Sequence, residues 1–195
     1  RSKSFTQKLD LISKLTICFL FLIFLVLLLK RSKSFTQKKA EANKFFVDNN
    51  ILPQTLAVLQ SRSTTIGIEL VQGEVDDWQP TSDFFGAIFQ YPGKYGQLID
   101  LQATIDIAKG LDIKTTVAAD IMSLALLEAP GTYGADVVVG STQRFGIPMG
   151  YGGPHAGYFA TKTEYKRSVP GRIIGVTQDK HCLLYTSDAA DEVDG

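Results

Sequence analysis

Three polar residues of this chain follow apolar runs, at the points where a site would form in an α/β sheet. Asp120 comes directly after the run 113–119, and Gln143 comes shortly after the β-branched run 135–140. His155 lies farther along, in a glycine-rich loop. Ligands of open α/β sheets bind outside the carboxyl ends of the strands. A carboxylate and an imidazole at such an edge are groups that acid–base chemistry would use.

A structural interpretation is open for each of these residues, and we favour it for Asp120 and His155. An Asp at this point commonly caps a helix or forms a loop hydrogen bond, so cofactor contact is the second alternative. A histidine with no carboxylate near it in the sequence gives little support to a general base. The loop has five glycines between residues 146 and 157, but no Gly-Lys-Ser/Thr ending and no dinucleotide fingerprint. We expect it to serve close backbone packing at an interface.

Composition argues against several classes of protein. Lys+Arg and Asp+Glu both number 20, so the formal net charge is zero and no basic surface for nucleic acid is indicated. The only cysteines are Cys18 and Cys182, which lie in the two ends of the chain and support neither a disulfide nor a thiol nucleophile. With His155 and His181 as the only histidines, we expect no metal site.

Strand and helix patterns alternate from residue 44 onwards. This order indicates βαβ units and a mostly parallel sheet. We expect Gly110 to end the second helix as its C-cap. The predicted strands are 44–47, 66–71, 84–89, 113–119, 135–140, 157–161 and 172–176, and the predicted helical segments are 53–61, 99–109, 122–127 and 164–167.

Several motifs allow a family comparison. The stretches LPQT, FFGAIFQYPGKYGQ, AADIMSLALLEAPG, YGADVVVG and STQRFGIPMGYGGPHAGYFATKTEYKRSVPGRIIGV resemble the P-protein family of the glycine cleavage system, the pyridoxal-phosphate (PLP)-dependent glycine dehydrogenases (decarboxylating). The resemblance covers about residues 31–179 and lies in the amino-terminal half of those two-halved enzymes. It implies an α/β fold of the fold-type I PLP-dependent transferase class, here an incomplete large domain whose mostly parallel sheet carries helices on both faces.

The resemblance also assigns places to two of the polar residues. Asp120 stands where the catalytic half carries the carboxylate for the pyridinium nitrogen, and Gln143 stands where that half carries its Schiff-base lysine. A glutamine amide cannot form an imine with an aldehyde, and the neighbouring Arg144 stays protonated. The resemblance therefore implies that this half has no catalytic residue of its own and that PLP is bound mainly by the other half.

The resemblance further implies an activity and partners for the parent enzyme. Such an enzyme decarboxylates glycine on PLP and transfers the aminomethyl group to the lipoyl group of H-protein. The expected partners are glycine, lipoylated H-protein and the catalytic half of P-protein, in a homodimer or a two-subunit heterotetramer. The expected location is the bacterial cytoplasm or the mitochondrial matrix.

Both ends of the chain depart from this pattern. RSKSFTQK occurs at 1–8 and again at 31–38, and the apolar run 15–29 between the copies is shorter than the ~20 residues of a spanning helix. We favour a spurious segment over a membrane anchor. Residues 182–192 resemble a translated sequencing adapter. We therefore divide the chain into 1–30, a partial domain 31–181, and a disordered tail 182–195.

Two other functions remain open at this point. A membrane-anchored, non-catalytic α/β protein would require the run 15–29 to be genuine. A stand-alone nucleotide- or sugar-binding domain would require a complete sheet and a phosphate motif, and the sequence shows neither.

Overall fold

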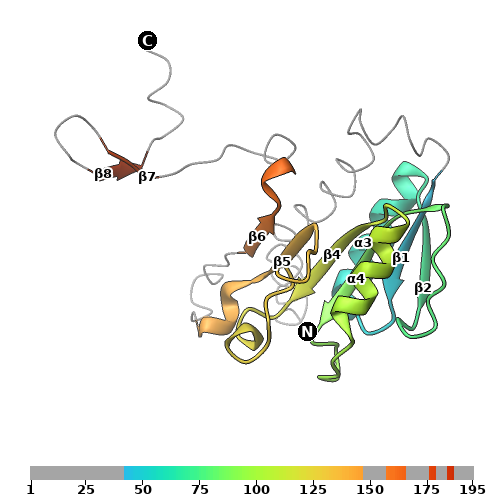
Figure 1. Cartoon of the computed structure of the whole chain (residues 1–195), viewed down its shortest axis with the longest axis horizontal. Helices are drawn as coiled ribbons and strands as arrows, with labels where there is room; N and C mark the ends of the chain where they lie inside the picture. The colour runs from blue at the N-terminus through green and yellow to red at the C-terminus, as the bar shows by residue number, and fades with distance from the viewer. Residues whose placement is uncertain (1–41, 147–156, 166–175, 179–183, 187–195) are drawn as a thin grey trace, which may run out of the picture.

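The structure is a computed structural model that describes residues 42–146, 157–165, 176–178 and 184–186. Its main feature is a six-stranded sheet with the order β2-β1-β3-β4-β5-β6 (Figure 1). Strands β1 to β5 are parallel to their neighbours, and β6 pairs with β5 in the antiparallel direction. The strands are β1 Lys44–Asp48, β2 Glu69–Gly73, β3 Phe84–Tyr91, β4 Lys114–Ala119, β5 Val137–Ser141 and β6 Gly157–Thr161.

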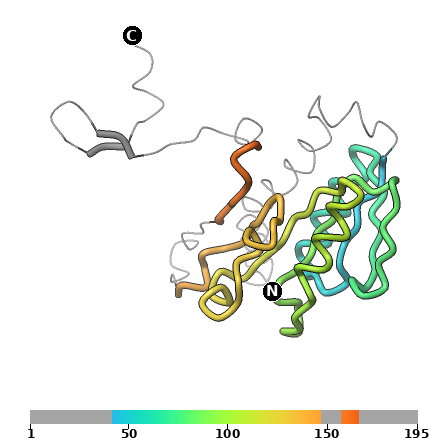
Figure 2. Tube along the Cα trace, in the orientation of Figure 1, coloured from blue at the N-terminus to red at the C-terminus, as the bar shows by residue number. Residues whose placement is uncertain are grey.

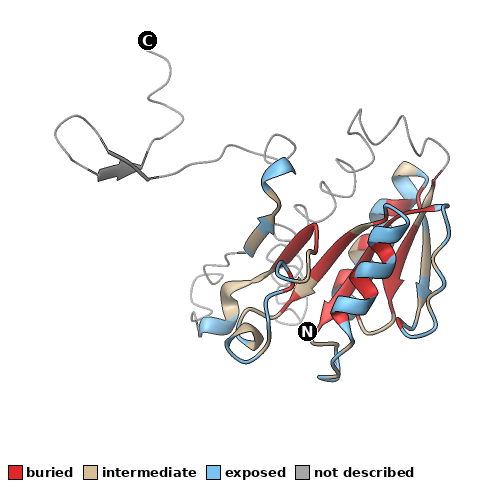
Figure 3. Ribbon diagram, in the orientation of Figure 1, coloured by how far each residue is buried: buried red, intermediate tan, exposed pale blue. Residues whose placement is uncertain are grey.

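Two helices cover opposite faces of this sheet. Helix α3, Pro53–Ile66, contributes Leu59 to one apolar cluster, and helix α4, Leu101–Gly110, contributes Ile105 to the other. Every residue of β3 is buried, as expected for a central strand covered on both faces. Figure 3 shows the buried residues concentrated in the central strands, while β6 is only partly buried. The predicted α/β architecture with helices on both faces is therefore present.

A β-bulge in β3 sets which side chains enter each cluster. Lys44 pairs with Phe84 and Phe45 pairs with Gly86, so Phe85 is the extra residue. Phe85 and Ile88 belong to the cluster under α3, whereas Phe84 belongs to the cluster under α4. A bulge shifts the alternation of the strand by one residue in this way. Glycine is required at position 86, because a Cβ there would lie 2.8 Å from the Phe45 ring.

The predicted boundaries hold for the apolar strands and fail in two places. Helix α3 continues to Ile66, so strand β2 begins at Glu69 and the predicted strand 66–71 starts three residues too early. Gly110 is the last residue of α4 and is not its C-cap, which is Leu111. The left-handed residue that ends this helix is Asp112, with φ 55°. Asp tolerates this conformation better than most residues, and here it pairs with the Lys114 ammonium at 2.9 Å.

The remaining elements are short. Among the described residues, three 3₁₀ turns follow strands: η1 Ser123–Ala125, η2 Thr142–Phe145 and η4 Thr163–Tyr165. Strands β7 Val176–Gln178 and β8 Leu184–Thr186 pair with each other in the antiparallel direction. The predicted strand 172–176 shares Val176 with β7, and its other residues lie outside the described ones. Strand β8 lies inside the tail for which no order was expected.

The amino-terminal end of the chain falls outside the described residues, as does most of the carboxyl-terminal tail. This holds for the whole segment 1–30, including the run 15–29, and the division of the chain into three parts stays a prediction. Among the helices that the structure describes, none has the length and apolarity needed to cross a membrane.

Candidate functional site

The carboxyl edge of the sheet brings together two of the three predicted site residues. Asp120 follows β4 and Gln143 lies in η2, directly after β5, and these two strands are neighbours in the sheet. The segments after β4 and β5, yellow and light orange in Figure 2, lie side by side at this edge. His155 lies outside the described residues, as does most of the glycine-rich loop.

Asp120 is held by its own loop and by Arg144. Its carboxylate accepts a hydrogen bond from the Met122 backbone N–H at 3.0 Å, and its carbonyl accepts one from the Ser123 hydroxyl at 2.7 Å. The Arg144 Nε lies 3.0 Å from the Asp120 Oδ2. The cationic partner of Asp120 is thus a residue of the chain itself, next to Gln143. Contact of Asp120 with a cofactor stays a prediction.

Gln143 is positioned by the turn that ends β5. The Ser141 side chain accepts a hydrogen bond from the Gln143 backbone N–H at 3.1 Å, and Gly146 closes the turn with φ 85°. This turn places Gln143 half-buried at the edge and Arg144 exposed beside it. No atom of Gln143 is a nucleophilic amine, so the position supports no covalent chemistry with an aldehyde.

Three lysines of the described residues have partners of their own. Lys162 pairs with Asp136 at 2.5 Å, and Lys114 pairs with Asp112, both at the amino edge of the sheet. Lys94 lies at the carboxyl edge, but its ammonium donates to the Asn49 carbonyl at 2.9 Å. At the places that the resemblance assigns to the Schiff-base lysine and the pyridinium carboxylate, the structure has Gln143 and an Asp120 carboxylate paired with a guanidinium, so the described residues do not fit PLP as a covalently held cofactor.

A polar cluster that the sequence did not indicate lies at the same edge, after β1 and β3. The Asp48 carboxylate is fully buried and accepts hydrogen bonds from the backbone N–H groups of Asn50 at 2.8 Å and Gln90 at 3.2 Å. Burial raises the pKa of this carboxyl above its usual value, although the two N–H groups act in the opposite direction. Asp48 thereby joins the ends of two strands.

Asn50 extends this cluster into the loop after β3. Its side-chain oxygen accepts a hydrogen bond from the Gln97 amide, and its carbonyl accepts one from the Lys94 backbone N–H at 2.9 Å. Gln97 in turn accepts from the backbone N–H of Gly93 through its carbonyl, at 2.9 Å, and from that of Tyr95 through its side chain, at 3.0 Å. We call this set of contacts, centred on Asn50 and Gln97, the Asn50–Gln97 clamp.

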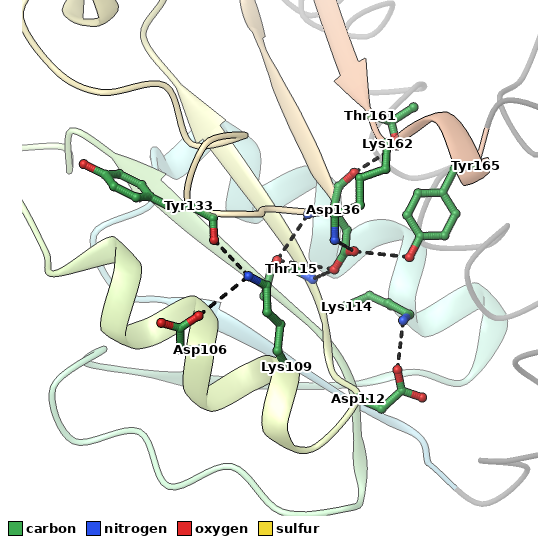
Figure 4. A network of polar contacts seen from close by, with 10 residues as sticks. All are labelled: Asp106, Lys109, Asp112, Lys114, Thr115, Tyr133, Asp136, Thr161, Lys162 and Tyr165. Atoms are coloured by element: carbon green, nitrogen blue, oxygen red, sulfur yellow. Dashed lines mark hydrogen bonds and ion pairs between the residues drawn. The ribbon is translucent and has the colours of Figure 1, made fainter.

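A second polar network lies at the opposite, amino edge of the sheet (Figure 4). The buried Asp136 carboxylate accepts from the Thr115 backbone N–H at 2.9 Å, from Lys162 and from the Tyr165 hydroxyl at 3.2 Å. Burial, followed by the Asp136 charge, raises the pKa of the Tyr165 phenol, so it remains a protonated donor. This network connects β4, β5 and η4 and is structural.

Within the described residues, no cluster of three or more His, Cys, Asp or Glu residues could hold a metal ion.

Comparisons with known proteins identify relatives of this arrangement. A family model described as "Glycine cleavage system P-protein" matches residues 29–183. The glycine dehydrogenase (decarboxylating) of Flavobacterium johnsoniae is 65% identical over 143 residues, which make up 73% of this chain and 15% of that protein. The corresponding protein of Christiangramia forsetii is 55% identical over the same shares. The chain thus spans about 15% of the length of these curated relatives.

Solved structures give the same result for the fold. An inhibitor-bound glycine decarboxylase (P-protein) superposes with a TM-score of 0.71 and 31% identity, over 86% of this chain and 38% of that one. A cystathionine gamma-lyase from Lactobacillus plantarum superposes with a TM-score of 0.56 and 16% identity, over 66% of this chain and 35% of that one. The predicted fold class, an incomplete fold-type I PLP-dependent transferase-like domain, is confirmed.

Proposed function

The chain belongs to the P-protein family of the glycine cleavage system, and on this premise we propose that it is part of a glycine dehydrogenase (decarboxylating). The whole protein would decarboxylate glycine and transfer the aminomethyl group to the lipoyl group of H-protein. The observation that carries the proposal is the 65% identity to the Flavobacterium johnsoniae enzyme across 73% of this chain. In such an enzyme PLP would supply the electron sink for loss of carbon dioxide.

Within this enzyme, we assign the segment a scaffolding role without a catalytic residue. Gln143 takes the lysine place, and Arg144 already neutralises Asp120 at 3.0 Å. PLP would then be held mainly by the catalytic half, which lies outside the matched segment. The parent would be a homodimer or a two-subunit heterotetramer in the bacterial cytoplasm or the mitochondrial matrix.

The activity can be tested in a hybrid enzyme. Residues 42–165 of this chain replace the matched segment of the Flavobacterium johnsoniae protein, and release of carbon dioxide from glycine is measured with lipoylated H-protein. We expect activity within about tenfold of the unmodified enzyme, because a scaffold from the same family preserves the packing of the other parts. A folded hybrid without activity would contradict the proposal.

The scaffolding role has a separate test. The chain is incubated with PLP, reduced with borohydride and mapped by mass spectrometry. We expect scattered, substoichiometric labelling, because only a free amine attacks an aldehyde and the ammonium groups of the described lysines are ion-paired or hydrogen-bonded. Stoichiometric labelling of a single lysine would show that this segment is itself a cofactor site. The Flavobacterium johnsoniae enzyme, treated in the same way, is the positive control.

A further inference from the structure

The loops after β1, β2 and β3 are joined by a continuous series of side-chain hydrogen bonds. The Tyr95 backbone N–H donates to the Gln97 Oε1 at 3.0 Å, and the Gln97 Nε2 donates to the Asn50 Oδ1. The Asn50 Nδ2 in turn donates to the Glu74 Oε2 at 3.2 Å. The Asn50–Gln97 clamp therefore continues to Glu74, the residue that directly follows β2.

The two ends of this series determine its direction. A backbone N–H only donates and an ionised carboxylate only accepts, so Tyr95 and Glu74 each require one kind of partner. A primary amide has an acceptor on one side and a donor on the other, and turning it over exchanges the two. With a donor at one end and an acceptor at the other, a single orientation of Asn50 and Gln97 satisfies every group. Turning either amide would place N–H against N–H or oxygen against oxygen.

Backbone contacts place Glu74 beside the turn after β1. Asp48 pairs with Gly73 in the parallel register, and the Asn49 backbone N–H donates to the Gly73 carbonyl at 2.9 Å. The Asn49 side-chain amide also donates to the Glu74 Oε1, at 3.0 Å. The two carboxylate oxygens thus accept from the two asparagines of this turn, which holds the carboxylate in one orientation.

The loop after β3 packs closely against the two amide side chains. A Cβ at Gly93 would lie 2.7 Å from the Gln97 Cδ and 3.1 Å from the Asn50 Cβ. The Lys94 backbone N–H donates to the Asn50 carbonyl at 2.9 Å. Because the backbone of the loop lies this close to both side chains, an amide that turns over should displace the loop.

We propose that Glu74 is the positioning residue of the loop after β3, on which its carboxylate acts through the two amides between them. The carboxylate sets the direction of Asn50 and Gln97, and this direction fixes the conformation of the loop. Negative charge by itself is not the cause, since Glu74 is exposed and a charge at the surface contributes little. The inference concerns the fold of this chain and does not depend on the proposed function.

Reversing the hydrogen-bonding character of position 74 tests the proposal. Amide exchange at Tyr95 is measured by mass spectrometry in the 195-residue chain. Glu74→Met removes the acceptor and should speed this exchange about fivefold, the effect of losing one ordinary hydrogen bond. Glu74→Lys should speed it more, because an ammonium only donates and would turn both amides over. Glu69→Lys, the same change in an exposed residue of β2, is the matched control and should have no effect.

A second substitution distinguishes direction from general stability. Asn50→Asp provides an acceptor to both of its neighbours, so it should compensate for Glu74→Lys and return exchange at Tyr95 to within about twofold of the unchanged chain. Alone, Asn50→Asp places two carboxylates against each other and should speed the exchange.

Three results would overturn the proposal. The first is equal exchange at Tyr95 in Glu74→Met and Glu74→Lys, or no change in either. The second is a double variant, Glu74→Lys with Asn50→Asp, that exchanges as fast as Glu74→Lys alone. The third is equal acceleration of the amides of β3, which would mean that the substitutions at position 74 destabilise the whole sheet.

Discussion

At Gly140 the main chain of β5 passes so close to its neighbours that a methyl group has no room. A Cβ there would overlap the Ala119 carbonyl oxygen and the Tyr158 ring. We expect Gly140→Ala to lower the free energy of unfolding by about 2–3 kcal/mol, the cost of forcing extra volume into a packed sheet. Urea unfolding of the chain followed by circular dichroism measures this change.

Gly110 provides the matched control for that substitution. It ends α4, and a Cβ there would meet no atom within 4 Å. We expect Gly110→Ala to leave stability unchanged or to raise it by up to about 1 kcal/mol, because alanine favours helix more than glycine does. If both variants lose the same stability, close packing at β5 is not the cause.

Asp48 should make the stability of the chain depend on pH. Burial raises its pKa in the folded state above the unfolded value of 3.8, so the folded protein binds this proton more tightly. Its contribution to stability is then greatest below the unfolded pKa and is lost as pH rises through the folded pKa. We expect the stability of Asp48→Asn relative to the unchanged chain to improve as pH rises from about 4 to 7. A difference that is constant across this range would contradict the assignment.

At the scale of elements, the loop after β3 depends on a residue in the turn after β1. We expect Asn50→Ala to speed amide exchange at Tyr95, because the Gln97 side chain that accepts from this N–H loses its own anchor. Exchange of amides within β3 should be unaffected, since the paired ladder remains. Hydrogen exchange read by mass spectrometry distinguishes the two segments, and equal acceleration in both would indicate general destabilisation.

The sequence predicted those elements whose apolar runs are continuous. Strands β1, β3 and β4 were placed within two residues at each end, because a doubly covered strand must be apolar throughout. The end of α3 was missed because residues 61–65, SRSTT, carry no apolar period. In the structure the hydroxyls of Thr64 and Thr65 bond back to carbonyls four residues earlier, and Gly67 ends the helix with φ 67°.

The sequence predicted where the candidate site lies in the fold, but it did not predict which side chains contact one another there. The rule that loops converge at the carboxyl ends of parallel strands was enough to bring Asp120 and Gln143 to one edge. The pairing of Asp120 with Arg144 joins residues 24 apart, and the Asn50–Gln97 clamp joins residues 47 apart. Neither spacing forms a local pattern, and the contact of Asp48 with β3 joins residues 42 apart.

At the scale of the whole molecule, the two edges of the sheet differ in how their polar groups are used. At the amino edge, the Asp136 carboxylate accepts hydrogen bonds from Thr115 in β4 and from Tyr165 in η4. The carboxyl edge pairs Asp120 with Arg144 but leaves Leu126, which is 93% exposed, and Phe145, which is 60% exposed. At the amino edge the polar groups hydrogen-bond to one another within the chain, whereas the carboxyl edge exposes apolar side chains.

This asymmetry predicts how the chain behaves when it is expressed alone. Apolar side chains gathered on one surface promote association, so we expect the unmodified chain to be poorly soluble. The double substitution Leu126→Ser and Phe145→Ser should raise the soluble fraction. It removes two exposed apolar side chains from the carboxyl edge, and neither side chain is part of the buried core. Ile107→Ser removes a side chain that is 54% exposed on α4 and should have little effect. Sedimentation of clarified lysates and light scattering of the purified chains provide the comparison. An equal gain from Ile107→Ser would mean that total exposed apolar area, and not the carboxyl edge, controls association.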